Sequence, residues 1–323
     1  MIPAYAAFIS GRTRLDLPGF PLRQPLRAAA QIMRLARLIR ENRIDTIFSS
    51  HLGFLRVAAV LRILTGARAF FHLGLPAGDL RWTVRLSAPF LGGGIAPAAH
   101  TKETWLAAGW PRKTLHEIRN YVDTEFFHPV ADKSEPRRRL GLPTEKKLIG
   151  YIGRIVPEKG VRTLVEAFNQ LATTVADVDL ILMGRGEPAY RLSLVSNADL
   201  RSRIHILPPA PNTQEYFAAL DIACVPSECE ETFPLAMLEA MSSGLPVVCS
   251  DVGMLPKIVG EANRDLVFRA GDALELSHVL ARILSAPNMT ERGMSLRKRA
   301  IEYYGPRDVV DAYERLMKIE LAD

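Results

Sequence analysis

The sequence contains few cysteines and no long apolar run. Its cysteines are Cys224, Cys229 and Cys249. Three cysteines cannot all pair in disulfides, and no two of them form the CxxC motif of a zinc site. A disulfide framework or a zinc site is therefore not expected, and a reducing cytoplasm fits this usage. No run of about 18 apolar residues is free of charge, so no transmembrane helix is predicted. The opening residues place no basic segment before an apolar run, and a secretory signal is not predicted either.

What is present is the composition of a globular protein with unevenly distributed charge. The length of 323 residues predicts two domains. The composition, 48% hydrophobic and 24% charged, is that of a globular protein. Residues 1–140 contain 21 Lys and Arg against 10 Asp and Glu, whereas the remainder contains 20 against 25. The basic first half is expected to meet an anionic surface, such as a membrane leaflet. Nucleic acid is not an expected partner, because no helix-turn-helix, zinc-finger or aromatic RNA-binding pattern is present.

Residues 27–42, RAAAQIMRLARLIREN, predict an amphipathic helix with a basic face. At about 100° per residue, Arg27, Arg34 and Arg37 fall on one side. The opposite side takes the apolar residues Ala29, Ile32, Met33, Ala36 and Ile39. Two interpretations stay open: a surface helix packed on a sheet, or a helix that also contacts anionic lipid.

Short apolar segments alternate with helical segments along most of the chain. In the first half, strands are predicted over residues 44–50, 67–73, 93–98 and 114–120. In the second half, strands are predicted over residues 147–153, 179–184, 203–207, 221–227, 245–251 and 265–268. This alternation predicts an α/β protein with two doubly wound parallel sheets, separated by a polar, proline-bearing linker. Ligands of such sheets bind at the carboxyl ends of the strands.

Two of the predicted strand ends carry residues suited to an anion. Residues 153–160, GRIVPEKG, place Arg154 and Lys159 beside a helix N-terminus, whose free N–H groups favour negative charge. The alternative is an ordinary solvated loop. Residues 183–188, MGRGEP, contain a Gly-x-Gly turn that allows a ligand to approach the backbone closely, or that is simply a tight turn.

A third strand end carries carboxylates. In residues 226–241, PSECEETFPLAMLEAM, Glu231 follows a strand and Glu239 lies inside the next helix, for which Thr232 is the expected N-cap. A carboxylate accepts hydrogen bonds from the hydroxyl groups of a ribose or a sugar. The single Asp-x-Asp, residues 177–179, precedes a strand, so we interpret it as a surface turn and not as a metal site.

Together these motifs resemble the nucleotide-sugar glycosyltransferases of the GT-B fold, in the large retaining family of group 1 transferases (GT4). Upstream, IRNYVDTEFFHP is similar to the family's linker signature, with Tyr121 in place of Gly. The resemblance implies two Rossmann-like domains that face each other across a cleft. The implied parts are an acceptor-side domain over 1–130, a linker over 131–146, a nucleotide-sugar domain over 147–302, and a C-terminal helix over 303–323 that crosses back to the first domain.

The resemblance also implies roles for individual residues. Arg154 and Lys159 would bind the donor diphosphate and stabilise it as it leaves, with no metal and no further cofactor. Glu239 would bind the ribose, and Glu231, with the backbone around Phe233, would hold the donor sugar. His72 would face the donor sugar from the first domain; the alternative is a hydrogen-bonded loop histidine. The remaining implied nucleotide contacts are Gly153, Gly184 and Leu235.

The implied function is retaining transfer of a hexose from a nucleotide-diphosphate sugar to a glycan or lipid-linked acceptor, in the synthesis of cell-surface polysaccharide or lipopolysaccharide. The protein would be cytoplasmic and peripheral on the inner face of the plasma membrane. The family's first strand, Gly-rich loop and helix have no counterpart here. That difference leaves open a start upstream of Met1, or a non-catalytic or partner-dependent relative. Pro234 and Pro208–Pro209 replace usual glycines, which leaves the donor open.

Overall fold

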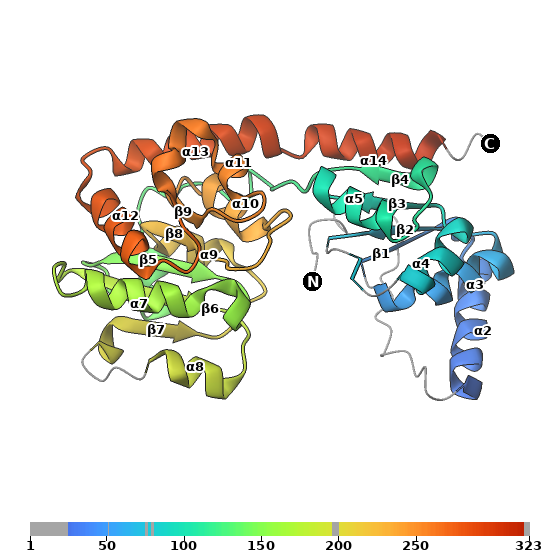
Figure 1. Ribbon diagram of the computed structural model, residues 1–323, viewed down its shortest axis with the longest axis horizontal. Coiled ribbons are helices and arrows are strands. Elements are labelled where there is room, and N and C mark those ends of the chain that lie inside the picture. Colours follow the sequence, from blue (N-terminus) through green and yellow to red (C-terminus); the bar gives the residue numbers. More distant parts are fainter. Residues whose placement is uncertain (1–24, 51, 75–76, 79–80, 196–199, 320–323) are drawn as a thin grey trace. The chain divides into compact units, whose positions relative to one another are not determined.

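The computed structural model describes residues 25–50, 52–74, 77–78, 81–195 and 200–319 (Figure 1). The chain divides into two compact units, with the boundary between Arg119 and Asn120. Each unit is built on one parallel sheet, as the alternating pattern predicts. None of the helices in the described ranges has the length and apolar character needed to cross a membrane.

The first unit contains a four-stranded sheet in the order β1-β2-β3-β4, with every neighbouring pair parallel. Its strands are β1 (Thr46–Ser49), β2 (Arg68–His72), β3 (Gly93–Ala96) and β4 (Leu115–Glu117). Its described helices are α2 (Pro25–Glu41), α3 (Leu55–Thr65), α4 (Arg81–Ser87) and α5 (Ala99–Ala107), with 3-10 turns at Leu52–Phe54, Ala88–Phe90 and Arg112–Thr114. All four strands predicted for this half are confirmed.

Helix α2 packs mainly on another helix, α3. Its Leu35 and Ile39 join Val57 and Leu61 of α3 in a small apolar cluster. Met33, which the helical pattern places on the apolar side opposite Arg27, Arg34 and Arg37, is 57% exposed. A single neighbouring helix covers a narrower stripe of α2 than the full width of its apolar side.

The second unit contains a six-stranded parallel sheet in the order β10-β9-β8-β5-β6-β7. Its strands are β5 (Lys147–Ile152), β6 (Val178–Met183), β7 (Ile204–Leu207), β8 (Ile222–Val225), β9 (Val247–Ser250) and β10 (Val267–Phe268). The chain builds outward from β5 in one direction and then from β8 in the other. The point where the order reverses, between β5 and β8, is where doubly wound sheets bind their ligands.

The second unit also contains helices. They are α6 (Ser134–Leu140), α7 (Val161–Leu171), α8 (Pro188–Leu194), α9 (Gln214–Ala219), α10 (Leu235–Ser242), α11 (Leu255–Val259), α12 (Ala273–Ser285), α13 (Met289–Tyr304) and α14 (Arg307–Ile319), with 3-10 turns at Pro157–Lys159, Arg201–Arg203 and Glu261–Leu266. Helix α7 packs beside α12, and α10 packs beside α13 (Figure 1). The expected C-terminal helix thus forms as α14, while its crossing to the first unit stays a prediction.

The polar segment expected as a linker contains helix α6. A buried ion pair connects this helix to the amino end of strand β8. Arg137 of α6 donates to the Asp221 carboxylate at 2.7 Å, and both side chains are 7% exposed. The same guanidinium donates to the Ala219 carbonyl, and the Leu148 N–H donates to Asp221. Burial by itself would raise the pKa of Asp221, but Lys133, the Leu148 N–H and Arg137 outweigh it and hold that pKa below its usual value.

The Asp-x-Asp segment is not a surface turn throughout, so that part of the prediction was wrong. Val178 begins β6, and Asp179 is buried inside the strand. Its carboxylate accepts hydrogen bonds from Lys146 at 2.8 Å and is 2.8 Å from His205 Nε2. These contacts outweigh the effect of burial and lower the pKa of Asp179. Cross-strand neighbours make this burial possible, and sequence spacing does not reveal them.

Candidate active site at the carboxyl edge of the second sheet

The two strands beside the reversal point carry loops that pack backbone against backbone. The loop after β5 ends at Gly160, where φ is +64°, and a Cβ there would lie 1.8 Å from the Pro226 carbonyl oxygen in the loop after β8. After β6, a Cβ on Gly184 would lie 1.6 Å from the Gly153 carbonyl oxygen. Only glycine fits at either position. The Gly-x-Gly turn was expected to let a ligand approach the backbone closely. At Gly184 the group that approaches is the Gly153 carbonyl of the protein itself.

Lys159 and Glu231 form an ion pair between these two loops. Lys159 Nζ lies 2.6 Å from Glu231 Oε1, and the two side chains are 18% and 12% exposed. Ser227, two residues after β8, donates to the same carboxylate oxygen at 2.5 Å. The Glu231 carbonyl accepts from the Met254 N–H at 2.9 Å. Lys159 and Glu231 were both expected from the sequence and lie 72 positions apart in the chain. Their pairing places a cation and a carboxylate at the reversal point.

Gly253 fixes the backbone of Glu231. Its φ is +55°, and a Cβ there would lie 2.4 Å from the Glu231 carbonyl oxygen and 2.8 Å from the Glu231 nitrogen. Both the conformation and the space require glycine. The position of Glu231 therefore depends on the loop after β9 as well as on its own loop.

Arg154 has a fixed backbone and an extended side chain. The Tyr151 hydroxyl donates to the Arg154 carbonyl at 2.6 Å. Burial, followed by the Glu231 charge, raises the pKa of Tyr151 far above its usual value, so the hydroxyl remains a donor. The Arg154 guanidinium is 3.8 Å from Glu158, with its side chain 64% exposed. A surface pair of this kind is weak, which leaves the guanidinium able to contact an anion.

Glu239 lies on α10, and its carboxylate accepts a hydrogen bond from Thr213 at 3.3 Å. Burial raises the pKa of Glu239 to about 7, and the Thr213 hydrogen bond opposes that rise. A carboxyl group with this pKa gains or loses its proton near neutral pH. A ligand hydroxyl that donates to it favours the ionised form.

Helix α10 begins after Pro234, which corrects the expected N-cap at Thr232. Pro234 is the N-cap residue, its side chain makes no capping hydrogen bond, and the helix starts at Leu235. Proline fixes the backbone ahead of the helix, and this favours a start after it. Leu235 is 37% exposed, so the first turn of α10 is accessible.

Phe233, just before α10, is held by the segment that joins the two units in sequence. Its ring lies 5.6 Å from that of Tyr304, edge to face. Its carbonyl accepts from Asn120 Nδ2 at 3.0 Å. Both contacts lie within the second unit, and Phe233 itself is buried. The backbone around Phe233 is therefore well fixed.

His72 lies in the first unit at the carboxyl end of β2, with 9% of its surface exposed. A Cβ on Gly74 would lie 3.2 Å from its ring, so the chain after the strand packs closely on the imidazole. His72 belongs to a different unit from the other predicted site residues. Its role toward a donor sugar stays a prediction.

The second unit contains most of the residues singled out from the sequence, which are Gly153, Arg154, Lys159, Gly184, Glu231, Phe233, Leu235 and Glu239. Direct contacts join Lys159 to Glu231 and the backbone of Gly184 to that of Gly153. Sequence reasoning missed four residues that hold them, namely Asn120, Thr213, Ser227 and Gly253. Only Ser227 carries a local signal, because it is the last residue of the strand predicted over residues 221–227. Within the described ranges, no group of three His, Cys, Asp or Glu side chains could hold a metal ion.

Two cations and the Glu231 carboxylate follow the strands beside the reversal point, and Glu239 lies on the helix after β8. This arrangement is suited to an anionic ligand that carries hydroxyl groups. Comparisons with known proteins agree with it. N-acetyl-alpha-D-glucosaminyl L-malate synthase of Bacillus anthracis is 27% identical over 218 residues, covering 66% of this chain and 56% of that relative. The lipopolysaccharide core biosynthesis mannosyltransferase LpsB of Rhizobium meliloti is 31% identical over 211 residues, covering 61% and 60%.

The matched part of this chain therefore spans between 56% and 60% of the length of these relatives. HepE of Anabaena, solved in complex with UDP and glucose, superimposes with a TM-score of 0.80 at 21% identity, over 94% of this chain and 84% of that one. This likeness confirms the predicted fold of two parallel α/β domains. Residues 132–307 match the family model described as glycosyl transferases group 1. Because that match covers more than half of the 323 residues, the chain belongs to the group 1 glycosyl transferases.

Proposed function

We propose that the protein transfers a hexose from a nucleotide-diphosphate sugar to a glycan or lipid-linked acceptor, in the synthesis of cell-surface polysaccharide or lipopolysaccharide. The observation that carries this proposal is the Lys159–Glu231 pair at the reversal point of the second sheet. The family match and the name of the Rhizobium relative support the reaction class and the broad product class.

Lys159 and Arg154 supply the positive charge that the reaction needs. When the bond between the sugar C1 and the phosphate oxygen breaks, its electron pair stays on the diphosphate, and negative charge grows there. Cations placed beforehand at that position stabilise the transition state more than the ground state. Lys159 is held in place by Glu231 at 2.6 Å, so it is positioned before the donor binds.

The two glutamates provide the acceptors for hydroxyl groups. As the diphosphate takes the Lys159 ammonium, the Glu231 carboxylate becomes available to accept from hydroxyls of the donor sugar. Glu239, with Thr213 beside it, accepts from the ribose. This division assigns phosphate contact to the loop after β5 and sugar contact to the loop after β8.

Retention of the anomeric configuration is the finer part of the proposal, supported by the resemblance to a retaining family. The donor is a nucleoside-diphosphate sugar that needs neither a metal nor a further cofactor, because Arg154 and Lys159 take the phosphate charge. The acceptor is a glycan or is lipid-linked, and the protein works peripherally at the cytoplasmic face of the plasma membrane. Comparing the configuration of product and donor by NMR tests retention, since an inverted product contradicts it.

Nucleotide binding tests the site directly. A thermal-shift panel of UDP, GDP, ADP and their sugar conjugates, followed by calorimetry, identifies the donor class. Lys159→Ala and Arg154→Ala should each weaken binding about 10- to 100-fold, as expected for a hydrogen bond to a charged group. Arg138→Ala, an exposed arginine on α6 at the opposite sheet edge, is the matched control and should bind like the unmodified protein.

The outcomes distinguish the two candidate functions. Binding that is lost in Lys159→Ala, together with release of the nucleoside diphosphate when acceptor is added, supports the transferase. Binding that depends on Lys159 without transfer to any acceptor favours the non-catalytic relative. If no nucleotide shifts the thermal transition, or if both site variants bind normally, the assignment of this site is wrong.

A further inference from the structure

Large apolar side chains are exposed on the first unit, over helices α3 and α4. Trp82 on α4 is 72% exposed, Leu86 on the same helix is 66% exposed, and Ile63 on α3 is 68% exposed. Exposed tryptophan and leucine side chains on neighbouring helices are typical of a surface that binds a membrane or another protein. Scattered single residues need no such explanation, so the question is whether these form one surface.

Contacts join these residues into one surface. Helix α3 packs against both α2 and α4, and Figure 1 shows the three helices close together in the first unit. Arg56 of α3 donates to the Thr83 hydroxyl of α4 at 2.9 Å. The Arg85 guanidinium lies 5.9 Å from the centre of the Trp82 ring. The apolar side chains are thus interleaved with arginines.

Helix α2 extends this surface with a row of arginines. Counted at about 100° per residue, Leu26, Met33 and Arg37 fall within about 40° of one another. They lie opposite Leu35 and Ile39, which pack on α3. Leu26 is 86% exposed and Met33 is 57% exposed. The helix carries four arginines and one glutamate over residues 25–41. Its outer face is therefore basic and partly apolar.

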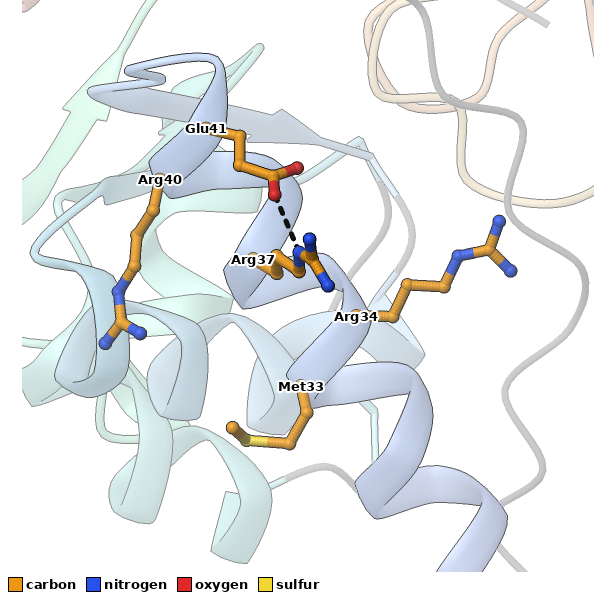
Figure 2. A pocket seen from close by; sticks show the side chains of 5 residues that line it. All are labelled: Met33, Arg34, Arg37, Arg40 and Glu41. Carbon is orange, nitrogen blue, oxygen red and sulfur yellow. Dashed lines mark hydrogen bonds and ion pairs between the residues drawn. The ribbon is translucent and has the colours of Figure 1, made fainter.

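Met33, Arg34, Arg37, Arg40 and Glu41 of α2 line a shallow hollow of about 650 Å³. Figure 2 shows these side chains. Arg34 and Arg40 extend to opposite sides of the helix, and Arg37 turns toward Glu41, which it contacts at 2.6 Å. Arg40 also donates to the Leu64 carbonyl at the end of α3. Arg37 and Glu41 are mostly exposed, so their pairing is weak and an anionic group can replace the carboxylate.

We propose that the outer face of α2, α3 and α4 docks on an anionic membrane surface. The arginines of α2 contact lipid phosphates, while Trp82, Leu86 and Ile63 enter the boundary between headgroups and acyl chains. A lipid surface fits because it offers negative charge beside apolar depth, and tryptophan favours that boundary. The purpose of this docking, access to a lipid-linked acceptor, rests on the proposed function, whereas the binding itself does not.

Vesicle sedimentation tests the charged part of the surface. The full chain should bind vesicles of equimolar phosphatidylcholine and phosphatidylglycerol, and bind pure phosphatidylcholine far more weakly. Replacing Arg34 and Arg37 together by serine should lower the partition coefficient about 30-fold, because each arginine near an anionic leaflet contributes about one factor of five. Replacing Arg138 and Arg139 on α6, two arginines of similar exposure, is the matched control and should change little.

Tryptophan fluorescence tests the apolar part. Trp82 is exposed, whereas Trp105 and Trp110 are 0% and 2% exposed, so Trp82 is the tryptophan that responds to a change of surroundings. Its emission should shift to the blue on binding, and brominated lipid should quench it. Trp82→Phe should remove the shift yet keep most of the binding, whereas replacing Trp82 and Leu86 by alanine should weaken binding at least about tenfold.

Several results would overturn the proposal. They are equal binding to both vesicle types, unchanged binding of the α2 variant, or no spectral change at Trp82. If the same substitutions remove nucleic-acid binding by the unmodified chain, or dissociate a dimer in sedimentation without vesicles, the surface belongs to that other occupant. Nucleotide binding measured on each variant separates the two proposals, because the docking variants should retain it.

Discussion

Replacing Glu239 by glutamine should stabilise the protein without its ligand, and increasingly so as the pH rises. Burial raises the pKa of this carboxyl group from its ordinary value of 4.5 to about 7 in the folded protein. In the unfolded chain the group loses its proton at a lower pH. Between these two pKa values the folded state binds more protons than the unfolded state, so the free energy of unfolding falls as the pH rises.

The magnitude follows from the size of that shift. A change of one pKa unit corresponds to about 1.4 kcal/mol, so the ionised carboxylate costs about 3 kcal/mol once the pH is well above 7. At about pH 5.5 the cost is only about 1 kcal/mol, because the folded state keeps its proton there. Glutamine is neutral at both pH values and its amide oxygen still accepts from Thr213, so the variant avoids the cost.

Urea unfolding at about pH 5.5 and about pH 8.5 measures this difference, which should be about 2 kcal/mol in favour of the variant. Glu302→Gln, on the exposed side of α13, controls for the loss of one negative charge. The same Glu239→Gln change should weaken nucleotide binding, because it removes the charged acceptor for the ribose. Equal stabilisation at the two pH values would refute the argument from burial.

Two further changes test what holds the fold and the site. Arg137→Ala leaves Asp221 buried without its closest charged partner. The variant should therefore lose about 3 to 5 kcal/mol in the free energy of unfolding, measured in the same urea assay. A loss below about 1 kcal/mol would contradict a buried ion pair. Gly253→Ala should displace the Glu231 backbone and weaken donor-sugar binding in calorimetry. Gly271→Ala is its control, because Gly271 has φ +78° but no atom within 4 Å of a Cβ, and equal effects on binding would remove the steric argument.

The sequence by itself determined the strands, the helices between them and the residues at the strand ends. Alternating apolar segments predict parallel strands because each must be buried on both faces. The strand-end rule then selects Arg154, Lys159 and Glu231. These signals are local: they depend on residues that lie within one loop or one turn of a helix.

Tertiary structure alone decided which of these residues meet and what holds them. The order β10-β9-β8-β5-β6-β7 brings the loops after β5 and β8 together, so Lys159 pairs with Glu231 across 72 positions. Burial of Asp179, of Arg137 and of the Glu239 carboxyl likewise depends on neighbours from distant strands and helices. The exposure of Met33 depends on packing in the same way. A helical pattern gives the direction of a side chain, but only packing decides whether another element covers it.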